Sequence, residues 1–312
     1  MKLLNDIDDD QIRIIGLSDN DDEKKTPEPR NWWIIISIVG AVLVGVVIFI
    51  ITLLSANKPS EQTKASDTSI SKQEPALFEP AKEPEYTKRE FLGKKVDSLT
   101  SGFTEIKDTI INDIPIRIFI PHNADLSLYV GKMNRADTCV IYAAQAADIR
   151  ADNGDIIGAF VLDGKPLAWG LSKKGYCASI NGKVTIGVAE NSPLFEQATE
   201  EGGYFFRQYP LVKDGKIVEN EPKGKSIRRA ICDRIGEIFM VETGTKESFH
   251  DFAQALVDLG VDQAIYLVGS SAYGWAIDET GATHEFGNDA YYTRNIRMPK
   301  NTSYIVWRKK IE

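Results

Sequence analysis

The feature that most constrains this chain is an uncharged apolar run from Trp32 to Leu54, with the sequence WWIIISIVGAVLVGVVIFIITLL. At about 1.5 Å of rise per residue, a helix over this run would be roughly 34 Å long, enough to cross a hydrocarbon core of about 30 Å. Trp32 and Trp33 stand at one end, where indole rings favour the membrane interface. The run therefore predicts one transmembrane helix over residues 32–54, with the lipid bilayer as its partner.

This run is better explained as an uncleaved anchor than as a cleaved signal peptide. The apolar region of a signal peptide is about 7–15 residues long and lies near the extreme N-terminus, whereas this run is longer and starts only at Trp32. Basic residues are slightly more numerous before the run than after it, which favours a cytoplasmic N-terminus. The C-terminal part is then expected in the periplasm or outside the cell. The basic residues are Lys24, Lys25 and Arg30 before the run and Lys58 and Lys64 after it.

The segments on either side of the run have the composition of unstructured chain. Residues 1–31 are acidic and polar, which is typical of a disordered cytoplasmic tail, with a protein-binding tail as the alternative. Residues 55–89 are rich in Pro, Glu, Lys and Ser, and such a segment cannot bury enough apolar surface to offset its ordering entropy. We expect a linker that holds a globular domain, residues 90–312, away from the bilayer.

Charge, cysteine and histidine patterns exclude several function classes. The net charge of −8 argues against a nucleic-acid partner, because phosphate backbones are bound by basic surfaces. Cys139, Cys177 and Cys232 form no C-x-x-C pair, and we expect all three to be small buried side chains, with one disulfide among them as the alternative. The three histidines have no metal-ligand spacing. The sequence therefore predicts neither a metal site nor a cofactor.

The C-terminal domain has the pattern of a strand-rich fold. Ile114, Ile116, Ile118 and Ile120 alternate with other residues, as they do in a half-buried strand. The apolar run from Thr138 to Ala144 predicts a buried strand. Three hairpins are predicted around tight-turn dipeptides, because Asp-Gly and Asn-Gly suit the positive φ angles of such turns. The dipeptides are Asp163-Gly164, Asn181-Gly182 and Asp214-Gly215.

Two segments have helical periodicity, residues 192–201 and residues 247–259. In the second, the apolar side chains recur on one face, Ser248 and Asp251 form an N-terminal cap, and Gly260 ends the helix. Strands are expected over 264–268 and 303–308. The fold class is therefore α+β, with a mostly antiparallel sheet and a few packed helices, plus the one transmembrane helix.

Two adjacent arginines, Arg228 and Arg229, fall on a predicted strand. Because neighbouring side chains of a strand point to opposite faces, one of them is expected to enter a pocket, where its planar fork would hold an anion. A surface position with a salt bridge is the alternative.

The order of features in residues 141–308 resembles the phosphodiester glycosidase domain, the family of the enzyme that uncovers mannose 6-phosphate. That family has an Asn-Ala-Gly strand end, an Asp-Gly-Lys hairpin, a Gln-Ser-Gly-Pro segment, an Arg-Thr-Ala-Ile-Gly strand and a final Leu-Asp-Gly-Gly-Gly-Ser motif. The similar segments here are Ala144-Gln145-Ala146-Ala147-Asp148, Asp163-Gly164-Lys165, Gln208-Tyr209-Pro210, Arg228-Arg229-Ala230-Ile231-Cys232 and Leu267-Val268-Gly269-Ser270-Ser271.

The resemblance implies a membrane-anchored protein of the cell envelope that cleaves or binds a sugar phosphodiester. Its candidate catalytic residues are Asp148, Arg228 and Glu242, and its candidate substrate-binding residues are Gln145, Gln208, Gly269, Ser270 and Ser271. Val268 stands where the family has Asp, and glycosidic cleavage uses a pair of carboxyl groups. The alternatives to a hydrolase are therefore a non-catalytic module that binds a glycan or another partner, and a scaffolding module without a ligand.

We predict that protease added to spheroplasts digests residues 90–312 and spares residues 1–31, because the apolar run is expected to cross the membrane with the tail inside. Epitope tags at the two ends, followed by immunoblotting, would measure this. A variant without residues 32–54 should leave the membrane fraction. Protection of the C-terminal tag would reverse the orientation, and a full chain that does not sediment with membranes would exclude the anchor.

Overall fold

The computed structural model describes residues 89–294 and 296–310. The predicted transmembrane helix, the acidic tail and nearly all of the predicted linker lie outside these residues. Within the described part of the chain, no helix combines the length and the apolar character that a bilayer crossing requires.

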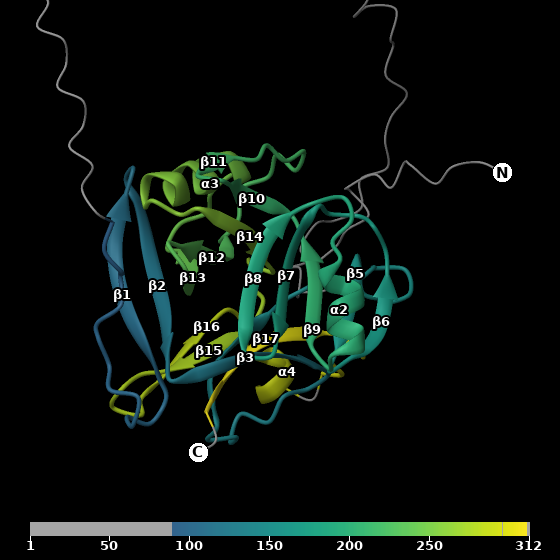
Figure 1. The fold of residues 1–312 in the computed structure, drawn as a ribbon, viewed down its shortest axis with the longest axis horizontal. Helices are drawn as coiled ribbons and strands as arrows, with labels where there is room; N and C mark the ends of the chain where they lie inside the picture. The colour runs from purple at the N-terminus through teal and green to yellow at the C-terminus, as the bar shows by residue number, and fades with distance from the viewer. Residues whose placement is uncertain (1–88, 295, 311–312) are drawn as a thin grey trace, which may run out of the picture. The chain divides into compact units, whose positions relative to one another are not determined.

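The described residues form three sheets, and every strand pairing among them is antiparallel (Figure 1). Sheet 1 has the spatial order β1 (Phe103–Ile111), β2 (Ile114–His122), β13 (Glu237–Thr243), β12 (Arg229–Arg234), β14 (Gln263–Leu267), β10 (Pro210–Lys213) and β11 (Lys216–Ile217). Sheet 2 has the order β16 (Thr283–Phe286), β15 (Gly274–Ile277), β4 (Val140–Gln145), β17 (Ser303–Lys309) and β3 (Ala124–Val130). Sheet 3 has the order β6 (Lys165–Trp169), β5 (Ala159–Leu162), β9 (Tyr204–Gln208), β7 (Gly175–Ile180) and β8 (Lys183–Val188).

Few helices accompany these sheets in the described residues. In Figure 1, α3 (Phe249–Asp258) lies beside β10 and β11 of sheet 1, and α2 (Leu194–Glu200) lies against sheet 3. The short α4 (Ala290–Thr293) follows β16. This architecture confirms a mostly antiparallel fold with a few helices.

One hydrophobic core is shared by all three sheets. Phe119 of β2, Tyr142 of β4 and Phe206 of β9 are buried in the same cluster, although each belongs to a different sheet. A second core lies between the opposite face of sheet 1 and α3. The alternating isoleucines of β2 contribute to this second core: Ile114, Ile116, Ile118 and Ile120 are all buried in it. The period-2 pattern therefore identified the face of β2 correctly.

The three predicted hairpins are confirmed. Each Asp-Gly or Asn-Gly pair has two consecutive residues with positive φ, for example 49° at Asp163 and 72° at Gly164. These angles match the type I′ turn, whose twist fits that of the flanking strands. Two further hairpins use residues that the sequence did not mark as turns: Asn112-Asp113 joins β1 to β2, and Ile235-Gly236 joins β12 to β13.

The predicted cap of α3 is also confirmed. The Ser248 hydroxyl accepts a hydrogen bond from the Asp251 amide at 3.0 Å. This bond satisfies one of the amides that the first helical turn leaves without a partner. Gly260 follows the helix with a φ of 82°, as expected for a residue that ends a helix in the left-handed conformation.

The prediction that all three cysteines are buried is wrong for one of them. Cys177 and Cys232 are buried, whereas Cys139 is exposed, and none of the three is in a disulfide. The reason is local: the strand that was expected from Thr138 begins only at Val140. Cys139 therefore lies in the turn before the strand and outside the core.

We predict that Ser248→Ala lowers the free energy of unfolding by about 1 kcal/mol, because the substitution removes the cap of α3. Chemical denaturation of the full chain would measure the change. Ser248→Asp serves as the matched control, because its carboxylate restores an acceptor for the Asp251 amide. Equal stability of the alanine variant and the unchanged protein would show that this cap contributes nothing.

Candidate functional site

The end of β14 brings together three segments that are distant in the sequence. The Val268 amide donates to the Gln145 carbonyl at 3.1 Å, and the Ser270 amide donates to the Ile227 carbonyl at 2.8 Å. The loop after β14 therefore lies between the end of β4 and the residue that precedes Arg228. The structure thus places Gln145, Arg228 and the predicted Gly269–Ser271 segment next to one another.

The backbone at Gly269 requires glycine. A Cβ atom at this position would lie 2.2 Å from the Ile227 carbonyl oxygen, far inside van der Waals contact. The Gly269 amide donates to the Tyr266 hydroxyl at 3.0 Å, and Ser270 adopts a φ of 54°. The hydroxyls of Ser270 and Ser271 have no hydrogen-bond partner among the described residues, so both can bind a ligand at this loop.

Asp148 is held in a buried network. Its carboxylate forms an ion pair with the Lys173 ammonium and accepts a hydrogen bond from Gln208 Nε2 at 3.1 Å. The Lys173 ammonium also donates to Gln208 Oε1 at 3.1 Å and lies 4.4 Å from the centre of the Tyr209 ring. The structure therefore brings together Asp148 and Gln208, two of the predicted site residues, and adds Lys173.

Lys173 was missed by sequence reasoning. It belongs to a Ser-Lys-Lys-Gly segment with no motif, which the sequence presents as an ordinary polar turn. Its φ of 64° turns the chain sharply before β7, and its side chain is only 4% exposed. The neighbouring Lys174 side chain is 62% exposed and pairs with Glu190. No local pattern distinguishes the buried lysine from the exposed one.

Arg228 lies beside this network and is almost completely buried. Its Nε donates to the Glu247 carbonyl at 2.8 Å, a second nitrogen donates to the Gly224 carbonyl, and its guanidinium lies 4.1 Å from the centre of the Phe249 ring. No carboxylate among the described residues forms an ion pair with it. Its positive charge is therefore bound by carbonyl dipoles and an aromatic ring rather than neutralised.

Tyr266 lies close to both Arg228 and Asp148. The Arg228 guanidinium is 5.9 Å from the centre of its ring. Burial raises the pKa of Tyr266, the Asp148 charge raises it further, and the Arg228 charge lowers it. The phenol therefore stays protonated.

Arg207 is a second buried guanidinium without a carboxylate partner among the described residues. Its Nη1 donates to the carbonyls of Lys173 and Ala189 at 3.2 and 3.0 Å, and its Nη2 donates to the Glu190 carbonyl at 2.7 Å. Its Nε has no partner, and burial lowers the pKa of this arginine. Lys173 neutralises Asp148, whereas Arg207 beside it has no described carboxylate partner, so the region around Lys173 has an excess of positive charge.

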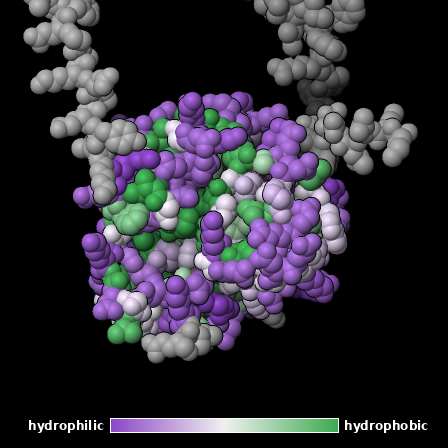
Figure 2. All heavy atoms as spheres, in the orientation of Figure 1, coloured by the Kyte–Doolittle hydropathy of each residue, from purple (hydrophilic) through white to green (hydrophobic). Residues whose placement is uncertain are grey.

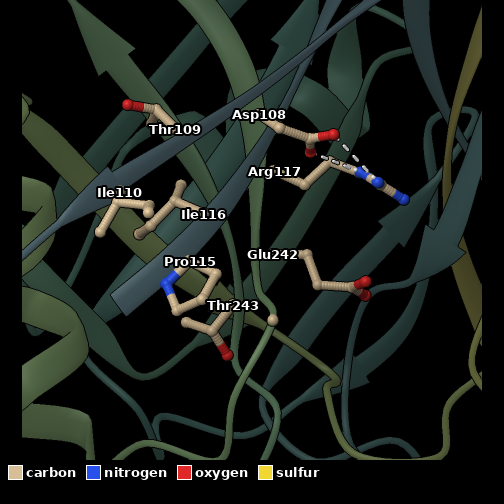
Figure 3. A pocket seen from close by; sticks show the side chains of 9 residues that line it. Asp108, Thr109, Ile110, Pro115, Ile116, Arg117, Glu242 and Thr243 are labelled. Carbon is tan, nitrogen blue, oxygen red and sulfur yellow. Dashed lines mark hydrogen bonds and ion pairs between the residues drawn. The ribbon is translucent and has the colours of Figure 1, made fainter. Parts of the chain in front are cut away.

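Glu242 lies in a different place from the Asp148 network. It lines a pocket of about 510 Å³ with residues of β1, β2 and β13 (Figure 3). Its carboxylate forms an ion pair with Arg229. None of the lining residues belongs to the network of Asp148, Lys173 and Gln208. The structure thus does not assemble Asp148 and Glu242 into a pair of carboxyl groups.

Arg229 and Arg228 point to opposite faces of sheet 1, as expected for neighbours at a strand. Arg229 Nη1 donates to the carbonyls of Val268 and Ala272 at 3.1 and 2.6 Å, and its guanidinium lies 4.6 Å from the centre of the Phe286 ring. Both arginines are buried, so neither is a surface strand charge. Arg229 holds the two ends of the loop that carries Gly269, Ser270 and Ser271.

The chain is similar in fold to two solved structures at low sequence identity. No protein-family model matches the chain, and no curated protein matches it significantly. Among solved structures, the chain is similar to the auto-inhibited catalytic domain of zebrafish N-acetylglucosamine-1-phosphodiester alpha-N-acetylglucosaminidase, with a TM-score of 0.47 and 16% identity over 67% of this chain and 83% of that chain. It is also similar to a hypothetical protein from Synechocystis, with a TM-score of 0.44 and 12% identity over 67% of this chain and 62% of that chain.

We predict that Lys173→Met destabilises the protein by about 3 kcal/mol, because it leaves the Asp148 carboxylate buried without its counter-ion. Lys174→Met is the matched control and should cost less than about 1 kcal/mol, since its ion pair is exposed. Adding Asp148→Asn to Lys173→Met should restore part of the loss. Denaturant unfolding of all four proteins would measure this, and equal effects of the two lysine substitutions would contradict a buried pair.

Proposed function

We propose that the domain binds a sugar phosphodiester, or another phosphate-bearing glycan, beside Arg228 and the Gly269–Ser271 loop, and does not hydrolyse it. The observation that carries this proposal is the buried Arg228 guanidinium without a carboxylate partner among the described residues. A buried charge that is not neutralised is costly. A bound phosphate would neutralise it and would accept a charge-assisted hydrogen bond from the guanidinium nitrogen that does not already donate to the Glu247 or Gly224 carbonyl.

The loop supports the same proposal. The Ser270 and Ser271 hydroxyls can donate to phosphate or sugar oxygens, and the loop is fixed by backbone bonds to Gln145 and Ile227. A loop that is already held in place loses little conformational freedom when a ligand binds. Arg207 adds a positive charge that no described carboxylate neutralises, which favours an anionic ligand.

The arrangement of carboxylates favours binding over hydrolysis. Glycosidic cleavage uses two carboxyl groups that flank the scissile bond. Asp148 is engaged by Lys173 and Gln208, Glu242 lines a separate pocket, and Val268 stands where the resembling family has Asp. The second candidate, a membrane-anchored glycosyl phosphodiester hydrolase, would need Asp148 to be released from Lys173 during the reaction.

The proposal also includes a location for the domain, at a membrane of the cell envelope. The apolar run over residues 32–54 would anchor the chain in a membrane of the cell envelope, and the Pro-rich segment that follows would serve as a stalk. The domain would then meet its glycan in the periplasm or outside the cell.

We predict that the full chain binds the methyl phosphodiester of N-acetylglucosamine 1-phosphate, and that Arg228→Met weakens this binding at least about tenfold, because it removes a charge-assisted hydrogen bond. Arg228→Lys should retain part of the affinity, since it keeps the charge. Arg308→Met is the matched control, because Arg308 pairs with Asp137 outside this region. Isothermal titration calorimetry would measure the affinities, with circular dichroism as the check on folding.

The same samples decide between the two candidates. Methyl N-acetylglucosaminide, which lacks the phosphate, should bind much more weakly than the phosphodiester. Release of methyl phosphate that disappears in Arg228→Met would overturn the binding-only proposal in favour of the hydrolase. Equal binding by Arg228→Met and the unchanged protein would overturn both.

A further inference from the structure

The pocket that contains Glu242 has an apolar half and a charged half. In Figure 3, Ile110, Ile116 and Pro115 lie on one side, and Asp108, Arg117 and Glu242 lie on the other. Ile110 and Asp108 belong to β1, at the edge of sheet 1. Figure 2 shows apolar residues among hydrophilic ones on the face of the molecule where β2 and β13 lie.

The charged half is the outer end of a row of alternating charges across sheet 1. In the strand register, Asp108 lies opposite Arg117, Arg117 opposite Glu242, and Glu242 opposite Arg229. The exposed fractions of their side chains fall from 65% and 45% to 15% and 2% along this row. The row therefore leads from solvent at β1 to the buried arginine that holds the loop after β14.

The pocket lining itself carries a net negative charge. Asp108 and Glu242 contribute two carboxylates, and Arg117 contributes one guanidinium, whereas Arg229 is buried behind Glu242 and does not line the pocket. Arg117 already donates to both oxygens of Asp108, at 2.8 and 3.1 Å. Glu242 has one described ion-pair partner, Arg229, through Oε2. Its second oxygen is left to face a ligand.

We propose that this pocket binds a primary alkylammonium group, with the ammonium on Glu242 and the hydrocarbon stem against Ile110 and Pro115. An anion would meet the two carboxylates and would find Arg117 already engaged. A neutral apolar ligand would leave the Glu242 oxygen without a partner, which is unfavourable at a group only 15% exposed. A free amine and a lysine side chain of another protein share the chemistry that the pocket recognises.

Occupancy of this pocket is coupled to the loop of the candidate site. An ammonium on the second Glu242 oxygen draws on the same carboxylate charge and weakens the ion pair with Arg229, and Arg229 holds the carbonyls of Val268 and Ala272. The Tyr142 hydroxyl is buried and has no hydrogen-bond partner among the described residues. Burial raises the pKa of Tyr142, and the nearby charges of Arg229 and Glu242 shift it in opposite directions.

Titration of the full chain with n-butylammonium, followed by NMR, tests the pocket. We expect saturable shifts of pocket resonances with a dissociation constant on the order of 1 mM for so small a ligand. Pentanoate and n-butanol, which have the same butyl stem without the positive charge, should produce none. An acetylated, amidated Ala-Lys-Ala peptide forms a second arm: tighter binding than the amine would identify a protein lysine as the source, and weaker binding would identify a free amine. Binding of neither would overturn the proposal.

Two variants test whether n-butylammonium binds in this pocket, and they differ in their expected effect on folding. Glu242→Gln should reduce binding at least tenfold, but it also removes an ion pair that supports the fold. Ile110→Arg is the safer variant, because Ile110 is 68% exposed and the new guanidinium would occupy the pocket in place of the ligand. Unchanged affinity in Ile110→Arg would overturn the assignment. Ile110→Val, which keeps the apolar wall, is the matched control and should bind normally.

Amide hydrogen exchange measures the coupling between the Glu242 pocket and the loop after β14. Saturating n-butylammonium should speed hydrogen exchange of the Ser270 and Ala272 amides at least threefold, and this effect should be absent in Ile110→Arg. Binding without any change in exchange would overturn the coupling. Arg228→Met should bind n-butylammonium as the unchanged protein does, because Arg228 lies on the other face of sheet 1. Loss of sugar phosphodiester binding in that variant is therefore distinguishable from failure of the pocket.

Discussion

The ion pair between Arg229 and Glu242 is the interaction on which the described site depends most. Arg229 is buried, and the same guanidinium that pairs with Glu242 also donates to the carbonyls of Val268 and Ala272. It thereby fixes β12, β13 and the loop after β14 with one side chain. A buried charge of this kind is stabilising only while its partners stay in place, so the position of the loop follows from the position of Glu242.

The buried arginines on the two faces of sheet 1 have different partners. On one face, Arg229 is neutralised by Glu242 and positions backbone carbonyls. On the other, Arg228 contacts carbonyls and the Phe249 ring, and no described carboxylate neutralises it. In the first arrangement the guanidinium is neutralised within the protein, whereas in the second no described carboxylate balances its charge. This contrast, between residues adjacent in the sequence, is the physical basis for assigning a binding role to Arg228 and a positioning role to Arg229.

Elements with a strong local pattern were predicted well. The alternating isoleucines of β2, the three glycine-containing hairpins and the capped helix α3 each depend on interactions within a short segment, and all were found where the sequence indicated. The hairpin at Ile235-Gly236 was missed because isoleucine is a poor turn residue and tertiary pairing of β12 with β13 imposes the conformation. Cys139 was placed wrongly because the apolar pattern extends past the true start of β4.

The sequence by itself determined the strand-rich class, the hairpin positions and the candidate segments around Gln145, Gln208, Arg228 and Gly269, because turn chemistry and side-chain alternation act locally. The tertiary structure decided which of these residues meet. It paired Asp148 with Lys173, a residue without any motif, and it placed Glu242 in a separate pocket. The hydrogen bond between Asp148 and Gln208, for example, joins residues 60 positions apart. Only the packing of three sheets around one core determines which charges are buried together.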